Sequence, residues 1–161
     1  MRSEGAVSLR RARREDLAAV AALHRLSLFD AMPDMPRLHT LQETVRFYEE
    51  VVSPRAEIWL AVDGDADEES LVGFIAFRPG WVEQLYVDPA HQGRGVGSRL
   101  LARAMNGAES LRLWTFVRNL PARRFYAARG FEVERTTDGA DNEEGEPDIL
   151  FCWRRSSHQS R

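Results

Sequence analysis

The sequence predicts an α/β layered domain, with a mixed central sheet of about seven strands flanked by four helices. Two observations lead to this fold class. Short runs of β type and longer runs with helical apolar spacing follow one another in the order β-αα-βββ-α-β-α-ββ. The chain also has 161 residues and 43% hydrophobic content, enough for one core, so we expect a single domain over residues 1–161.

The N-terminal half is expected to hold two helices between a first strand and a group of three strands. Pro33 and Pro36 end the first helix, because proline lacks an amide donor and clashes with the preceding turn. Thr40 and Glu43 have the spacing of a capping box and so begin the second helix. The expected ranges are strand 7–11, helices 15–31 and 41–52, and strands 57–63, 70–77 and 81–87, of which the first two form a hairpin.

The C-terminal half continues with helices and strands after a glycine-rich loop. Pro121 is tolerated in the first turn of a helix and Gly130 suits a helix C-terminus, so the two bracket one helix. Residues 155–161, like residues 1–5, are expected to be disordered. The expected ranges are a helix ending near Met105, strand 111–117, helix 120–129 and strands 131–137 and 147–154, the last two joined by an acidic loop.

Composition and charge exclude several classes of protein. The formal net charge is −3, and all 22 basic residues are arginine. A chain without lysine cannot carry a Walker-type phosphate loop or Schiff-base chemistry, and this charge gives no sign of nucleic-acid binding. The apolar runs are shorter than a membrane helix needs, and the lone Cys152 excludes an internal disulfide. We therefore expect a cytoplasmic protein that binds neither membrane nor nucleic acid, and no metal, because the histidines lack metal-ligand spacing.

A glycine-rich segment between an expected strand and an expected helix is the strongest feature. Gly93, Gly95 and Gly97 alternate with other residues, which removes Cβ atoms from one side and permits unusual backbone angles. The free N–H groups of the helix start then point to one spot, where the helix dipole favours an anion such as a pyrophosphate. A dinucleotide fold is disfavoured, because its Gly-x-Gly-x-x-Gly loop comes early in the chain. A glycine turn without a ligand is the other interpretation.

Two segments resemble the GNAT acetyltransferases. Residues 85–101 look like the central motif of that family, whose Gln/Arg-x-x-Gly-x-Gly/Ala pattern is met by Gln92, Gly95 and Gly97. Residues 119–131 are similar to its second cofactor motif, and the order of elements matches over nearly the whole chain. The resemblance implies an N-acetyltransferase with acetyl-CoA as the acyl donor.

The same resemblance implies roles for individual residues. Asn119 would lie against the pantetheine arm, and Tyr126, about two helical turns later, would protonate the leaving thiolate. The alternative for Tyr126 is a packed core aromatic. In the family, a bulge separates the strand that pairs with the pantetheine arm from the next strand of the sheet. The implied cofactor-binding residues are Leu85, Tyr86, Val87, Gln92, Gly93, Arg94, Gly95, Val96, Gly97, Ser98, Asn119 and Tyr126.

A base is also needed, because an alkylammonium must lose a proton before its nitrogen can attack. Glu83 is expected to share a strand face with Leu85 and Val87 and so to reach the cleft, directly or through a water. An ordinary exposed strand glutamate is an equal alternative. Some family members place a glutamate on the next strand, where Trp114 stands here, and His39 is a weaker alternative.

The acidic loop bears on the acceptor. A run of charge is usually only solvated, yet a loop that overhangs the cleft would attract a cationic amine. We expect a small polar or cationic amine as acceptor, and a homodimer is compatible with the sequence. Two alternatives stay open: a non-catalytic acyl-CoA-binding or sensor domain, and a peptide or protein N-terminal acetyltransferase. The loop contains Asp138, Asp141, Glu143, Glu144, Glu146 and Asp148, and Phe29, Met32 and Met35 are candidates for an apolar acceptor wall.

Overall fold

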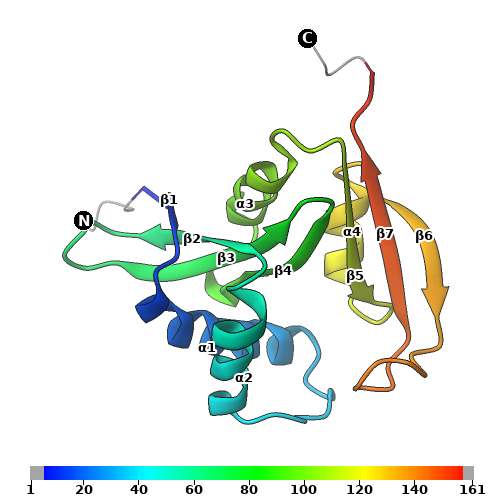
Figure 1. Ribbon diagram of the computed structural model, residues 1–161, viewed down its shortest axis with the longest axis horizontal. Helices are drawn as coiled ribbons and strands as arrows, with labels where there is room; N and C mark the ends of the chain where they lie inside the picture. Colours follow the sequence, from blue (N-terminus) through cyan, green and yellow to red (C-terminus); the bar gives the residue numbers. More distant parts are fainter. Residues whose placement is uncertain (1–5, 158–161) are drawn as a thin grey trace.

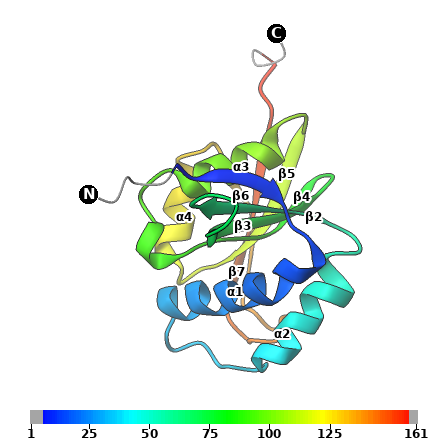
Figure 2. The same cartoon turned by 90° about the vertical axis from the view of Figure 1, so that its left-hand side faces the viewer.

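The computed structural model describes residues 6–157, which fold into a seven-stranded sheet with helices on both faces (Figures 1 and 2). The sheet order is β1-β2-β3-β4-β5-β7-β6, and every neighbouring pair is antiparallel except β4 and β5. The predicted mixed sheet is confirmed. The strands are β1 (Ser8–Arg11), β2 (Glu57–Asp63), β3 (Ser70–Arg78), β4 (Trp81–Val87), β5 (Ser110–Phe116), β6 (Glu132–Thr137) and β7 (Asp148–Arg154), and the helices are α1 (Leu17–Ala31), α2 (Leu41–Phe47), α3 (Val96–Met105) and α4 (Leu120–Ala127).

The helix ends follow the local signals in the sequence. At the start of α2, Thr40 Oγ1 accepts from the Glu43 amide and Glu43 Oε1 accepts from the Thr40 amide, both at 3.2 Å, so the capping box is present. Helix α2 stops at Phe47 and continues as a wider turn, η2 (Tyr48–Val52). After α4, Gly130 adopts φ 89°, which only glycine reaches without strain.

The C-terminal end of the described chain is bound to the domain at Arg155. Its amide donates to the Glu109 carbonyl at 2.8 Å, and its guanidinium donates to the carbonyls of Ala108 and Met105. Arg155 therefore belongs to the folded part, although the sequence placed it in a disordered tail. Of the predicted tails 1–5 and 155–161, residues 1–5 and 158–161 lie outside the described residues.

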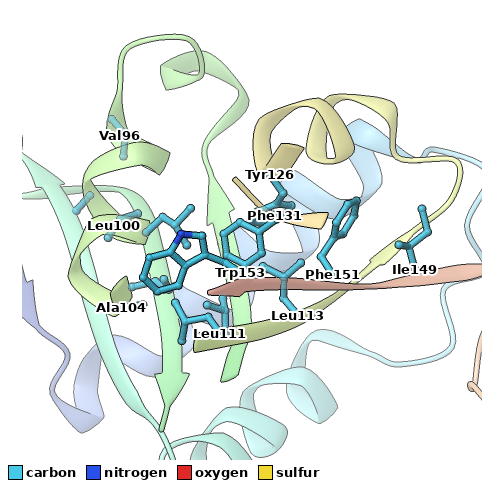
Figure 3. Packing of buried hydrophobic residues seen from close by; sticks show 14 of the residues in the cluster. Val96, Leu100, Ala104, Leu111, Leu113, Tyr126, Phe131, Ile149, Phe151 and Trp153 are labelled. Carbon is cyan, nitrogen blue, oxygen red and sulfur yellow. The ribbon is translucent and has the colours of Figure 1, made fainter. Parts of the chain in front are cut away.

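Two apolar cores lie on opposite faces of the sheet. One joins the sheet to α3 and α4 and contains Leu100, Leu111, Phe151 and Trp153, all buried (Figure 3). The other joins the sheet to α1 and η2. Its main members are Leu17, Val20, Tyr48, Val52 and Phe74. Both layers of helices are thus fixed to the sheet by side chains that exclude water.

The sheet opens between β4 and β5, its only parallel pair among the described strands. A single residue pair, Trp81 with Arg112, joins them, whereas β5 and β7 pair along seven residues. A bulge lies in β4, because Val82 pairs with Phe77 and Gln84 with Ala76, which leaves Glu83 without a partner. The two strands therefore diverge beyond Trp81, and the space between them holds the site described below.

Candidate functional site

A cavity of about 630 Å³ lies where β4 meets the start of α3, and we call it the donor cavity. Every residue predicted to bind the cofactor lines it except Arg94, whose side chain is exposed outside the lining. The structure adds residues that the motif did not name. Those used below are Ser27, Phe125 and Arg129.

The glycine-rich loop has the backbone geometry that an anion site needs. Gly93 and Gly95 adopt φ 77° and 80°, and Gly95 is the N-cap of α3. The first bond of the helix runs from the Arg99 amide to the Gly95 carbonyl at 3.1 Å, so the three amides before Arg99 have no partner within the helix. A Cβ on Gly97 would lie 3.2 Å from the Phe125 ring, so this glycine lets α3 and α4 approach closely. The loop therefore fits a pyrophosphate group.

The open edge of β4 has the geometry for binding an extended chain. The Asp88 amide donates to the Val72 carbonyl on β3 at 2.8 Å, and the pairing register continues from there along the strand. Because hydrogen-bonding direction alternates in an antiparallel pair, the backbone groups of Leu85 and Val87 point away from β3, toward the gap. The Val87 carbonyl already accepts from Ser27 Oγ at 2.9 Å and from Gln92 Nε2 at 3.2 Å. The Leu85 groups and the Val87 amide remain for a pantetheine arm.

A second cavity, of about 490 Å³, lies on the other side of the gap, and we call it the acceptor cavity. Most of its lining comes from β4, β5, β6 and the β6–β7 loop, and the rest comes from α1, α4 and β7. Four carboxylates and one guanidinium line it, so it favours a cation: Glu83, Asp141, Glu144, Asp148 and Arg135. The donor and acceptor cavities share Leu28, Leu85, Tyr86, Asn119, Ala122 and Tyr126, which form their junction.

Tyr126 stands at this junction on α4. Its ring is packed edge-on against Phe125, with centroids 5.1 Å apart, and only 7% of the residue is exposed. It is also packed edge-on against Phe131, with centroids 5.4 Å apart (Figure 3). Burial, and after it the neighbouring Tyr86, raises the pKa of Tyr126, so the hydroxyl keeps its proton at neutral pH. A proton donor and a packed core aromatic are therefore compatible interpretations of Tyr126, since the packed residue also lines both cavities.

Asn119 has a structural task as well as a place in the lining. Its Oδ1 accepts from the Ala122 amide at 3.2 Å, which caps the N-terminus of α4. The same residue lines both cavities. Its side-chain amide is thus held at a fixed position beside the gap in the sheet.

Glu83 lines the acceptor cavity but not in the way the strand alternation predicted. The bulge interrupts the alternation: Leu85 and Val87 pack against the core on the α3 side, whereas the Glu83 carboxylate is bound by two arginines. Arg78 Nε donates to Oε1 at 2.6 Å and Arg55 Nε donates to Oε2 at 3.0 Å. The expectation of a shared face is wrong, and both oxygens of Glu83 are engaged.

His39, the weaker alternative for the base, and the buried His24 have partners of their own. Nδ1 of His24 lies 2.6 Å from the Tyr48 hydroxyl, and its ring stacks on Tyr86 with centroids 4.5 Å apart. His39 is exposed, and its Nε2 lies 3.0 Å from Glu143 Oε2, which links the α1–α2 connection to the β6–β7 loop. Neither histidine lines the donor or the acceptor cavity.

Sequence reasoning missed several polar residues of the donor cavity, among them Ser27 and Arg129. Ser27 follows Leu23 at helical spacing, so a polar residue at a core position of α1 was the available signal. Arg129 Nε donates to Ser98 Oγ at 3.0 Å, and its guanidinium lies 3.7 Å from the centre of the Phe125 ring. No pattern in the sequence joined Arg129 to Ser98, because their contact depends on how α3 packs on α4.

The described part of the chain contains no group of three or more His, Cys, Asp or Glu side chains able to hold a metal ion. Nor does any helix within residues 6–157 have the length and apolar character to cross a bilayer. These findings concern the described residues alone.

A glycine loop at a helix start, joined through a parted strand pair to a second cavity, has the arrangement that a transferase using a coenzyme A thioester needs. Comparison with known proteins agrees: the model described as "Acetyltransferase (GNAT) family" matches residues 20–131. The chain belongs to the GNAT family of acetyl-CoA-dependent N-acetyltransferases.

The chain is also similar to individual members of this family. It is 32% identical over 131 residues to the peptidyl-lysine N-acetyltransferase YjaB of Salmonella typhimurium, covering 79% of this chain and 84% of that protein. The mycothiol acetyltransferase of Rhodococcus jostii is 37% identical over 71 residues, which is 40% of this chain and 23% of that one. Among solved structures, apo YjaB of Escherichia coli has a TM-score of 0.71 at 26% identity, covering 92% of this chain and 97% of its own. The PaiA N-acetyltransferase of Thermoplasma acidophilum, solved with coenzyme A, has a TM-score of 0.70 at 20% identity, covering 93% and 99%.

Proposed function

We propose that this enzyme moves the acetyl group of acetyl-CoA to a primary amine of a small cationic acceptor. The observation that carries the proposal is the acidic lining of the acceptor cavity, where Asp141 and Glu144 face a space that opens onto the donor cavity. Carboxylates at such a site raise the local concentration of a cation and disfavour an anionic acceptor. A molecule with a second ammonium group suits this lining better than a neutral amine.

The donor is expected to lie along β4. The amides from Gln92 to Ser98 would hold the pyrophosphate, and the free backbone groups of Leu85 and Val87 would pair with the pantetheine arm. That arm would bring the thioester to the junction, beside Tyr126 and Asn119. Bound in this way, the thioester supplies the activated acetyl group, and the chain supplies position and proton transfer.

Tyr126 is the proposed general acid. When the amine nitrogen bonds to the acetyl carbon and the carbon–sulfur bond breaks, the departing thiolate needs a proton. The Tyr126 hydroxyl lies at the junction and is protonated at neutral pH, because burial raises its pKa. It would therefore give its proton as negative charge develops on sulfur.

A lysine side chain of a peptide is the second candidate acceptor. Its favouring observation is the relative YjaB, which is named a peptidyl-lysine N-acetyltransferase and is 32% identical to this chain. A lysine ends in the same primary ammonium as a small alkylamine, so the acidic lining does not separate the two. What would separate the two acceptors is whether a peptide, as well as a small amine, can enter the acceptor cavity.

An acceptor panel tests the proposal. Purified enzyme with acetyl-CoA would be given 1,4-diaminobutane, a lysine-containing peptide, glutamate and a thiol, and acetylated products would be measured by mass spectrometry. We expect the highest kcat/KM for the diamine. Acetylation of the peptide at a higher kcat/KM would favour the second candidate, and acetylation of only glutamate or the thiol would contradict both.

A further inference from the structure

The four carboxylates of the acceptor cavity differ in what already binds them. Both oxygens of Glu83 accept from arginines, as described above. Asp148 accepts from the Thr137 hydroxyl on Oδ1 and from Asn142 Nδ2 on Oδ2, the latter at 3.2 Å. Within residues 6–157, Glu144 and Asp141 accept no hydrogen bond and form no ion pair through their carboxylates. Only these two carboxylates of the lining have free oxygens for a substrate.

Glu144 and Asp141 differ in their position relative to the reacting atoms. Glu144 is half-buried, whereas Asp141 is exposed. Glu144 and Tyr86 line the same acceptor cavity, and burial first, and then the negative charge of Glu144, raises the pKa of Tyr86. Tyr86 is a junction residue, lining both cavities as Tyr126 does. Glu144 is therefore the free carboxylate beside the junction.

The loop that carries Glu144 is fixed on both sides of it. Asn142 Nδ2 donates to the Glu146 carbonyl at 2.7 Å, and the Glu146 amide donates back to Asn142 Oδ1 at 3.1 Å. The Glu146 carboxylate accepts from Arg118 Nε at 2.6 Å, and Glu143 Oε2 lies 3.0 Å from His39 Nε2. A carboxylate on a loop held in this way keeps its position, which proton transfer requires.

We propose that Glu144 is the general base that takes the proton from the acceptor amine. This assignment rests on the proposed function. The acceptor enters as an ammonium and gives one proton to Glu144, which passes it to solvent. Its nitrogen lone pair then bonds to the acetyl carbon while the carbon–sulfur bond breaks. The thiolate takes a proton from Tyr126, and the second proton lost by the nitrogen restores that tyrosine. The products are the amide, the free thiol of coenzyme A and one proton in solution.

The test compares single carboxylate-to-amide substitutions with 1,4-diaminobutane as acceptor. We expect Glu144→Gln to lower kcat by roughly 10²-fold or more, the range of general base catalysis. Asp141→Asn, which removes a charge from the same cavity, should raise KM and leave kcat within about threefold, because it acts on attraction alone. Glu132→Gln removes an exposed carboxylate of β6 outside the cavity and should change neither constant.

A second acceptor separates proton transfer from a structural effect. An alkoxyamine is already neutral at pH 7 and has no proton to give before attack, so Glu144→Gln should slow its acetylation far less than that of the diamine. The other ionisable groups that face this cavity are Glu83, Tyr86, Tyr126, Arg135, Asp141 and Asp148, and they are the same in both reactions. Coenzyme A titration by calorimetry should give the same Kd for Glu144→Gln and wild type, which shows an intact fold.

Three outcomes would overturn the assignment. An equal loss with both acceptors would assign Glu144 a structural task, and a kcat within threefold of wild type would remove it from proton transfer. A larger loss in Glu83→Gln than in Glu144→Gln would return the role of base to Glu83. Absence of any transfer by the wild-type enzyme to the diamine or the alkoxyamine would instead contradict the proposed function, and this assignment with it.

Discussion

Tyr126 combines a packing task in the core with the proposed role of general acid. Its ring belongs to the core between the sheet and α4, while the residue also lines the donor and acceptor cavities. Among residues 6–157 the hydroxyl has no hydrogen-bond partner, so a bound thioester would meet an unengaged donor. The packing around the ring fixes the direction of that donor.

Replacement of Tyr126 by phenylalanine separates the two tasks. Tyr126→Phe keeps the ring and its contacts, so coenzyme A should bind with an unchanged Kd. We expect kcat to fall by roughly 10²-fold or more, because the thiolate loses its proton donor. Steady-state kinetics with saturating acetyl-CoA would measure this. Tyr86→Phe is the matched variant, since Tyr86 shares the junction, and a greater loss there would transfer the role of acid to Tyr86.

The role of a single residue could be predicted from the sequence when its neighbours in space are also its neighbours in the chain. Gln92, Gly95 and Gly97 lie in one continuous segment, so their spacing alone located the loop that lines the donor cavity. The direction of Glu83 depends instead on the register between β3 and β4 and on two arginines of other elements, Arg78 at the end of β3 and Arg55 before β2. A bulge cannot be read from alternation, because it is the interruption of alternation.

At the level of elements, the order of strands and helices was predicted within a few residues, because each is short and clearly periodic. The divergence of β4 from β5 was not visible in their sequences. It arises because only Trp81 and Arg112 pair, and no pattern of residues in a strand predicts where its pairing with a neighbour ends. The family resemblance implied this gap, and the structure confirms it.

The left-handed glycine at the start of α3 allows a matched test of that element. Gly95 has φ 80° and Gly107, in the turn after α3, has φ 81°, and a Cβ at either position would meet no atom within 4 Å. An alanine at either should therefore cost the same backbone strain, about 1 kcal/mol of the free energy of unfolding. Of these two glycines, only Gly95 lines the donor cavity.

We expect Gly95→Ala to raise the Kd for coenzyme A by roughly tenfold, a loss of about 1.4 kcal/mol of binding, because the strain turns the helix-start amides away from the anion. Gly107→Ala should bind as wild type does. Calorimetric titration measures both, and chemical denaturation confirms that the two variants are destabilised alike. Equal affinity in the two variants would show that the amides beside Gly95 do not hold the ligand.

At the scale of the whole molecule, a buried aromatic cluster joins the helical layer of α1 and η2 to the sheet beneath the site. His24 on α1 bonds to Tyr48 on η2, Tyr48 packs edge-on against Phe74 on β3, and His24 stacks on Tyr86 on β4. Tyr86 in turn lines the junction of the two cavities. The helical layer beside the junction is therefore held by His24, a residue whose side chain titrates near physiological pH in an unfolded chain.

Burial, and after it the charge of Arg25, lowers the pKa of His24 to about 4. Its pKa in an unfolded chain is about 6.5, so the unfolded state binds a proton first as the pH falls. The stability that neutral His24 contributes is therefore fully present above pH 6.5 and is lost as the pH falls toward 4, in total about 3 kcal/mol of the free energy of unfolding.

The expected experiment is urea denaturation of wild type and His24→Gln across this range. Glutamine does not titrate and can still bond to the Tyr48 hydroxyl, so wild type should lose about 3 kcal/mol more than the variant between pH 6.5 and 4. His39→Gln is the opposite control. The carboxylates of Glu143 and Glu43 raise the pKa of exposed His39, so its contribution is present at low pH and lost as the pH rises through that raised value. If the free energy of unfolding of wild type and His24→Gln changed with pH in parallel, His24 would accept a proton in the folded molecule. Water would then reach the layer beside the junction.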